Sequence, residues 1–258
     1  MRRLERDGVG LAYADVGAGD PALLLLHGIA CDHTHLRPQL EHFSRRHRVV
    51  AMDLRGHGAS DAPDEVYGAE LIAGDVAWLS RQLGLERPVV VGHSLGGVVA
   101  LAVAALFPDV AGAIVALDSP LIPSPERQAR MRDFIARLRT DAYEEELTRY
   151  FSALFIDTDD LERRSRIVAD ALQVPRHVTV SVWEQWALEF DTAAAASACG
   201  VPFLYVDAGT ANTQLGRLAE LCPTLSIGRT VGAGHFHQLE VPEQVNAMLE
   251  RFLVTNAI

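Results

Sequence analysis

The chain has 258 residues, of which 49% are hydrophobic, and its formal net charge is −11 at pH 7. This length and apolar content are enough for one large core, so we expect one main domain of the α/β class. The negative charge argues against nucleic acid and anionic membranes as partners. We expect a small-molecule substrate as the partner, and a homodimer stays an alternative to a monomer.

The N-terminal residues and the cysteines favour a cytoplasmic protein. Residues 1–8 are partly basic, but no apolar segment follows them, so no secretory signal is expected. Cys31, Cys199 and Cys222 are far apart in the sequence and form no Cys-x-x-Cys pair. Neither a disulfide framework nor a zinc site is therefore predicted, and a reducing compartment fits this pattern.

Apolar strands alternate with helical patterns along most of the chain, which indicates a mostly parallel sheet with helices on both faces. A short alternating segment at 10–16 predicts a hairpin strand. Further strands are predicted, in chain order, at 22–26, 49–53, 89–91, 113–117, 201–206 and 225–229. Helices are predicted at 36–46, 69–83, 95–107 and 213–221, and a last one begins at Pro242.

The alternation lapses between Ser119 and Ala198, where no strand is predicted. A Pro-rich linker at 120–125 opens this segment, and amphipathic helices follow at 126–140, 143–155, 161–172 and 178–190. We therefore expect a core made of residues 1–118 and 199–258, with a helical cap inserted at 119–198. Ligands of such sheets bind outside the carboxyl ends of the strands, where we expect the cap to lie.

Ser94 is the candidate nucleophile. It is the centre of Gly92-His-Ser-Leu-Gly96, which lies between the apolar run 89–91 and a helical pattern. A strand that enters a sharp turn and then a helix projects the serine hydroxyl from the sheet edge. Glycine at both flanking positions lets the backbone turn tightly.

Four segments at predicted strand ends together resemble the α/β-hydrolase superfamily: His27-Gly-Ile29, Asp53-Leu-Arg-Gly-His-Gly-Ala-Ser60, the turn at Ser94, and Gly232-Ala-Gly-His-Phe236. The resemblance covers the chain from about 11 to 253. It implies an eight-stranded, mostly parallel sheet flanked by helices, and a hydrolase that uses no cofactor and no metal. It also implies that the backbone amides of Ile29 and Leu95 form an oxyanion hole, which stabilises the tetrahedral intermediate.

The base is chosen by position among 10 histidines. A serine hydroxyl attacks a carbonyl only when a base takes its proton, and a neutral imidazole suits that task. His235 lies in the Gly-rich loop between the last strand and the last helix, where the resemblance places the base. His237 is the alternative, and His93 is expected to pack or hydrogen-bond beneath Ser94.

The acid that orients the base has more than one candidate position. Many family members carry it in a Gly-x-x-Asp turn, and this chain has Gly209-Thr-Ala-Asn212 there. An amide does not stabilise an imidazolium as a carboxylate does, so Asn212 is expected to cap the helix at 213–221 instead. Asp118, after the strand at 113–117, is the preferred acid, as in zearalenone lactonase-like enzymes and cofactor-independent quinolone dioxygenases. Asp207 is the alternative acid, and Asp118 is otherwise a structural turn residue.

Five further side chains are expected to line the substrate site, or else to pack the cap onto the core. They are Trp183, Trp186, Phe151 and Phe155 in the cap and His33 near the first strand turn. His33 also stands close to Asp32 and His35, but this spacing lacks a fourth ligand, so no metal site is predicted.

The sequence thus predicts a serine hydrolase that cleaves a small, moderately apolar ester or lactone through an acyl-enzyme on Ser94. Serine at this position disfavours the dehalogenase and epoxide hydrolase branches, which need a carboxylate nucleophile. Two alternatives stay open. One is a cofactor-independent dioxygenase or C–C bond hydrolase that uses His235 and Asp118, and the other is a small-molecule receptor that keeps the triad.

Overall fold

Eight strands form one sheet in the computed structural model, which describes residues 1–258. They are β1 (Arg2–Arg6), β2 (Val9–Val16), β3 (Leu23–Leu26), β4 (Val49–Met52), β5 (Val89–His93), β6 (Ala113–Leu117), β7 (Phe203–Asp207) and β8 (Leu225–Arg229). Their order in space is β1-β2-β4-β3-β5-β6-β7-β8, and only β1 with β2 and β2 with β4 pair antiparallel. The predicted eight-stranded, mostly parallel sheet is therefore confirmed.

The sequence pattern does not predict β1, whose side chains are mostly charged. This strand pairs with β2 in a hairpin that turns at Asp7 and Gly8, both with positive φ (53° and 80°). An Asp-Gly pair fits the two-residue turn that closes such hairpins. The turn, and not the hydrophobicity of the strand, accounts for β1.

Six of the helices come before β6 or after β7 in the chain. These are α1 (Arg37–Phe43), α2 (Ala69–Gln82), α3 (Leu95–Leu106), α9 (Leu215–Leu221), α10 (His237–Glu240) and α11 (Pro242–Thr255). The helices between β6 and β7 are α4 (Pro125–Leu138), α5 (Tyr143–Ser152), α6 (Leu161–Ala171), α7 (Arg176–Glu184) and α8 (Thr192–Ala198). Two short helical turns are η1 (His33–Leu36) and η2 (Gln185–Glu189). No helix is both long enough and apolar enough to cross a membrane.

Alternate residues of the central strands face two different helical layers. Leu24 and Leu26 of β3 pack in the core that includes residues of α2, α3 and α8. Leu23 and Leu25 point the other way, into the core that includes residues of α1 and α11. All four leucines are fully buried, which is typical of parallel strands covered on both faces.

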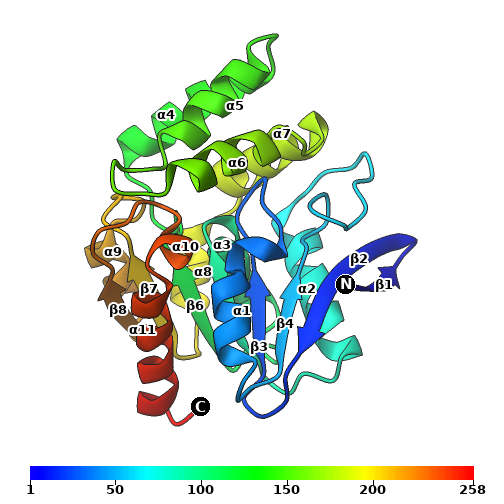
Figure 1. The fold of residues 1–258 in the computed structure, drawn as a ribbon, viewed down its shortest axis with the longest axis vertical. Coiled ribbons are helices and arrows are strands. Elements are labelled where there is room, and N and C mark those ends of the chain that lie inside the picture. The colour runs from blue at the N-terminus through cyan, green and yellow to red at the C-terminus, as the bar shows by residue number, and fades with distance from the viewer.

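The helices α4 to α7 form a separate layer above the sheet (Figure 1). All of them fall within the segment 119–198 predicted as the cap. The next helix, α8, packs against α3 on the side of the sheet. The helix expected at 178–190 is interrupted, because α7 ends at Glu184 and the π-helical turn η2 follows it.

Candidate active site

Ser94 occupies the sharp turn between β5 and α3. Its backbone has φ 53° and ψ −116°, a conformation that costs a residue with a side chain about 1–3 kcal/mol. A Cβ atom at Gly92 would overlap the backbone of Gly96, and one at Gly96 would overlap the backbone of Leu26. Only glycine fits at these two positions, so the predicted reason for the Gly-x-Ser-x-Gly spacing is borne out by the local geometry.

His235 and Asp118 form a buried pair whose members are far apart in the sequence. Nδ1 of His235 lies 2.6 Å from Oδ2 of Asp118, and their side chains are 5% and 0% exposed. Asp118 follows β6 and His235 follows β8, so the two side chains meet at the carboxyl edge of the sheet. Because Nδ1 faces the carboxylate, the imidazole has its Nε2 edge free for another partner.

The loop after β7 supplies most of the other contacts of Asp118. The hydroxyl of Thr210 donates to both carboxylate oxygens (2.8 and 2.9 Å), and the backbone N–H of Ala208 donates to Oδ1 (3.2 Å). Burial raises the pKa of Asp118, but the hydrogen bond and charge of His235 and the hydrogen bond of Thr210 bring the pKa below its ordinary value. The carboxylate is therefore ionised at neutral pH.

Asn212 does not cap a helix, so that prediction is wrong. The helix α9 begins at Leu215 with Gln214 as its cap residue. The side chain of Asn212 is buried and donates through Nδ2 to Oδ2 of Asp118 (2.7 Å) and to the backbone carbonyl of Asp118 (3.1 Å). The same nitrogen lies 3.3 Å from Nδ1 of His235. Asn212 thus stands beside the pair, where a Gly-x-x-Asp turn would place its carboxylate.

The alternative base and acid contact other groups. Nδ1 of His237 lies 2.9 Å from Oγ1 of Thr230, and burial lowers the pKa of His237 to about 4. Asp207 accepts a hydrogen bond from Nε of Arg229 (2.6 Å) and one from the N–H of Gly209 (2.9 Å). No hydrogen bond joins His237 or Asp207 to the side chains of His235 and Asp118.

The sequence predicts that His93 packs or hydrogen-bonds beneath Ser94, and in the structure its ring lies against His235. Its Nε2 lies 3.0 Å from the carbonyl oxygen of His235, and the two rings are 4.6 Å apart. Burial lowers the pKa of His93 well below its ordinary value, so the ring is neutral and donates to that carbonyl. This contact helps to hold the loop that carries His235.

The amides of Ile29 and Leu95 are near the same site. Leu95 is the first residue of α3, and an N–H at that position has no partner within the helix. Ile29 lies in the turn after β3. Both residues line one cavity together with Ser94 and His235.

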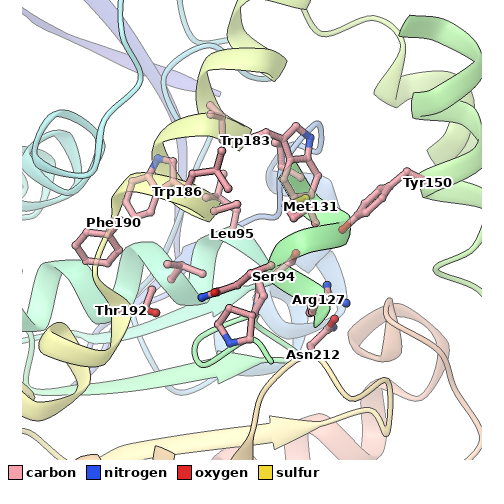
Figure 2. Close-up of a pocket in the computed structure, with 18 of the residues that line it drawn as sticks. Ser94, Leu95, Arg127, Met131, Tyr150, Trp183, Trp186, Phe190, Thr192 and Asn212 are labelled. Carbon is pink, nitrogen blue, oxygen red and sulfur yellow. The ribbon is translucent and has the colours of Figure 1, made fainter. Parts of the chain in front are cut away.

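That cavity is open to solvent at its mouth, and 11 of its 19 lining residues are hydrophobic. It is lined by Ile29, Ser94, Leu95, Val98, Pro120, Pro123, Arg127, Gln128, Met131, Tyr150, Val182, Trp183, Trp186, Ala187, Leu188, Phe190, Thr192, Asn212 and His235. Figure 2 shows Trp183, Trp186 and Phe190 around the upper and outer parts of the cavity, with Ser94 at its centre. A concave lining of apolar side chains with a few polar groups is typical of a site for a small organic molecule.

Of the five predicted wall residues, Trp183 and Trp186 line this cavity and the other three do not. Phe151 lines a smaller hollow that Ser94 and His235 also line. Phe155 stacks on Phe236, with ring centroids 5.1 Å apart.

His33 and its neighbours are engaged with nearby groups. Nδ1 of His33 lies 2.8 Å from Oδ1 of Asp53, whose hydrogen bond raises the pKa of His33. Asp32 accepts from the N–H of Thr34 (2.8 Å) at the start of η1, and His35 lies against Asp32. No group of three or more His, Cys, Asp or Glu side chains in the structure is arranged to hold a metal ion.

Arg127 and Tyr150 are cavity residues that are not predicted from the sequence, and the predicted wall residue Trp186 lies in a turn that is not predicted. Trp186 lies in the π-helical turn η2 and its indole N–H donates to the carbonyl of Tyr67 (3.0 Å), which fixes the ring in the wall. Such turns occur often at functional sites. Arg127 on α4 and Tyr150 on α5 also line the cavity. Charged and aromatic residues recur along the cap helices, and no spacing in the sequence separates these two from their neighbours.

Comparisons with known proteins give one consistent picture. A family model described as alpha/beta hydrolase fold matches residues 21–242. The chain is 37% identical over 117 residues to 2-(acetamidomethylene)succinate hydrolase of Mesorhizobium japonicum, across 45% of this chain and 42% of that protein. It is 40% identical over 116 residues to epoxide hydrolase 3 of Xenopus tropicalis, across 43% of this chain and 32% of that protein. The chain thus matches less than half the length of these curated relatives.

A solved structure similar to this chain is an esterase from Thermogutta terrifontis with malate bound. The TM-score is 0.86 at 26% sequence identity, and the match covers 99% of both chains. The whole length of the chain, cap helices included, therefore has a counterpart in a known structure.

Proposed function

Because this chain belongs to the α/β-hydrolase family, we propose that it is a serine hydrolase of a small, moderately apolar carboxylic ester or lactone. The contact between His235 and Asp118 (2.6 Å) at the cavity that Ser94 lines is the observation that carries this proposal. An oriented imidazole next to a strained serine is the arrangement that activates a hydroxyl for attack on a carbonyl.

The first half of the reaction forms an acyl-enzyme. Oγ of Ser94 attacks the carbonyl carbon while Nε2 of His235 takes the hydroxyl proton, and Asp118 stabilises the imidazolium that results. The carbonyl oxygen becomes an oxyanion, which the N–H groups of Ile29 and Leu95 stabilise. The bond to the leaving alkoxide then breaks, and His235 gives that oxygen its proton.

The second half reverses these roles with water. His235 takes a proton from water, the hydroxide forms a bond to the acyl carbon, and the bond to Ser94 breaks. The proton returns from His235 to the serine oxygen. In a lactone the alcohol stays tethered to the acyl group, so one hydroxy acid leaves instead of an acid and an alcohol.

The relatives support hydrolase activity, but their names describe the cleavage of different bonds. The Mesorhizobium protein is named as a hydrolase of a substituted succinate, and the Xenopus protein as an epoxide hydrolase. Opening an epoxide through an alkyl-enzyme needs a carboxylate nucleophile. Serine at position 94 favours acyl transfer, and the apolar wall with Trp183 and Trp186 suits a small apolar substrate group.

The test combines covalent labelling with turnover. A serine-reactive phosphonate is expected to add once to the wild-type protein, as measured by intact mass, and not to add to Ser94→Ala. Short-chain phenyl esters and γ- and δ-lactones are the substrates for turnover, which is expected to vanish in Ser94→Ala. Ester turnover that persists in Ser94→Ala would rule out the acyl-enzyme. Oxygen consumption without ester cleavage would point instead to dioxygenase chemistry.

A further inference from the structure

Arg127 brings a permanent positive charge to the wall of the cavity that holds Ser94. It lies in the first turn of α4, where its N–H donates to Oγ of the cap residue Ser124 (3.2 Å). Its side chain is half-buried. The capped helix start fixes the backbone from which the guanidinium reaches the cavity.

The guanidinium of Arg127 has no carboxylate partner in the protein. Four of the six buried or half-buried arginines contact a carboxylate, and the two that do not are Arg127 and Arg164. Of these two, only Arg127 lines the cavity, and no Asp or Glu lines it. A ligand that covers this half-buried guanidinium would remove its charge from water, which is costly unless the ligand itself brings a negative charge.

Tyr150 adds a neutral hydrogen-bond donor close to Arg127. Burial raises the pKa of Tyr150, although the positive charge of Arg127 and a hydrogen bond with it act in the opposite direction. The hydroxyl therefore keeps its proton at neutral pH. In Figure 2, Arg127 and Tyr150 lie on one side of Ser94, whereas Trp186 and Phe190 lie on the other side. The cavity thus has a cationic end and an apolar end.

We infer that Arg127 binds a carboxylate of the substrate, so that the substrate is a monoanion. It would carry a carboxylate on one side of the scissile ester or lactone carbonyl and an apolar group on the other. This inference rests on the proposed function. The planar guanidinium donates two parallel hydrogen bonds to a carboxylate, which an ammonium group does not. Because the protein has a net charge of −11, an anionic substrate needs such a local cation.

The apolar end selects the other half of the molecule. Trp186 is held by its hydrogen bond to the carbonyl of Tyr67 (3.0 Å), and its ring lies 5.4 Å from that of Phe190. A phenyl or short alkyl group that packs against these two side chains buries apolar surface there. Half-esters of short dicarboxylic acids have this combination of a carboxylate, a central ester and an apolar group.

The experiment compares monophenyl glutarate with its neutral analogue methyl phenyl glutarate. The variants are Arg127→Gln, which removes the charge, Arg127→Lys, which keeps it, and Arg130→Gln as the control. Arg130 is on the same helix, is exposed and has no ion pair. We expect Arg127→Gln to lower kcat/KM for monophenyl glutarate roughly 10- to 100-fold, mainly through KM. Its effect on the neutral ester should be at least five times smaller. Arg127→Lys should recover part of the loss, and Arg130→Gln should match the wild type.

Two results would separate this inference from the proposed function. If Arg127→Gln lowers turnover of both esters equally, or of neither, the carboxylate site is wrong while ester hydrolysis stands. If the wild type hydrolyses neither of these esters nor the short-chain phenyl esters and lactones named above, the proposed function fails, and calorimetry with monophenyl glutarate then decides the inference. Binding that weakens at least tenfold in Arg127→Gln, but not in Arg130→Gln, would support the carboxylate site, and equal or absent binding would overturn it.

Discussion

Asn212 donates to Asp118 over 2.7 Å, on the same carboxylate oxygen that lies 2.6 Å from His235. The amide therefore occupies the place of a carboxylate without its charge, and the charge comes from the end of β6 instead. This arrangement explains how a Gly-x-x-Asn turn after β7 is compatible with an oriented histidine. It also yields two predictions that depend on where the charge lies.

Replacing the acid should nearly abolish turnover. Asp118→Asn keeps the size of the side chain but leaves the imidazolium of His235 without a negative partner, so kcat should fall on the order of 10⁴-fold. Steady-state kinetics on a phenyl ester checks this. The control is Asp207→Asn, which removes a carboxylate that contacts Arg229 and not His235. Full activity in Asp118→Asn together with loss in Asp207→Asn would exchange the roles of the two acids.

Moving the charge to position 212 should restore part of the activity. Nδ2 of Asn212 is already 3.3 Å from Nδ1 of His235, so an Asp at this position would reach the imidazole. We expect Asp118→Asn/Asn212→Asp to exceed Asp118→Asn at least tenfold in kcat/KM. Asn212→Asp alone places two carboxylates in contact, which raises the pKa of one of them and should lower activity at neutral pH. A double variant no better than Asp118→Asn would show that position 212 cannot orient the base.

The sequence predicts the site residues at the strand ends better than it predicts the residues that surround them. Ser94, Asp118 and His235 each follow a strand, and the order β3-β5-β6-β7-β8 brings parallel strand ends to one edge. Strand ends are visible in the sequence as apolar runs that stop at Gly, Asp or Ser. The contact of Asn212 depends instead on a loop in which Ala211 has φ 55°, and nothing in the sequence requires that conformation.

The cavity residues of the cap are also difficult to predict from the sequence. Its helices are predicted from periodicity, but which of their faces meets the cavity depends on how they are placed over the sheet. Trp186 lines the cavity because a π-helical turn redirects it, whereas Phe155 is turned toward Phe236. Arg127 looks like any other arginine of an amphipathic helix in the sequence. Only the structure shows that it lacks an acidic partner.

A buried ion pair between the segment after β4 and the helix α2 should be important for stability. Arg55 contacts Asp75 through two hydrogen bonds (2.6 and 2.8 Å), and their side chains are 3% and 0% exposed. Asp75→Asn leaves the buried guanidinium of Arg55 with Glu65 as its one carboxylate partner (2.8 Å) and also removes the partner of Arg6. The free energy of unfolding should therefore fall by about 3 kcal/mol, the lower end of the range for a broken buried pair. Urea denaturation measures this. Asp109→Asn breaks an exposed pair with Arg81 (2.8 Å) and is the matched control, expected to change little. Equal effects of the two substitutions would contradict the role of burial.

The stability of the fold should fall as the pH drops below about 6.5, the ordinary pKa of a histidine. Burial is the main cause that lowers the pKa of His57 to about 3 and that of His237 to about 4. Between these values and 6.5 the unfolded chain binds protons that the folded chain does not, so the free energy of unfolding decreases with falling pH. His33, whose pKa is raised, is protonated in both states below pH 6.5 and adds no slope there.

His57 is the residue with which to test this pH dependence. Its Nδ1 donates to the carbonyl of Arg55 (3.0 Å), while its Nε2 is buried without a partner. Each proton taken up on unfolding gives a slope of about 1.4 kcal/mol per pH unit. Urea denaturation at pH 7.5, 6.0 and 5.0 should therefore show a slope that is shallower by about this amount in His57→Gln than in the wild type. The surface variant His177→Gln controls for the loss of a histidine. If the slope of His57→Gln equals that of the wild type, His57 is protonated in the folded protein and the assignment of a neutral, buried imidazole is wrong.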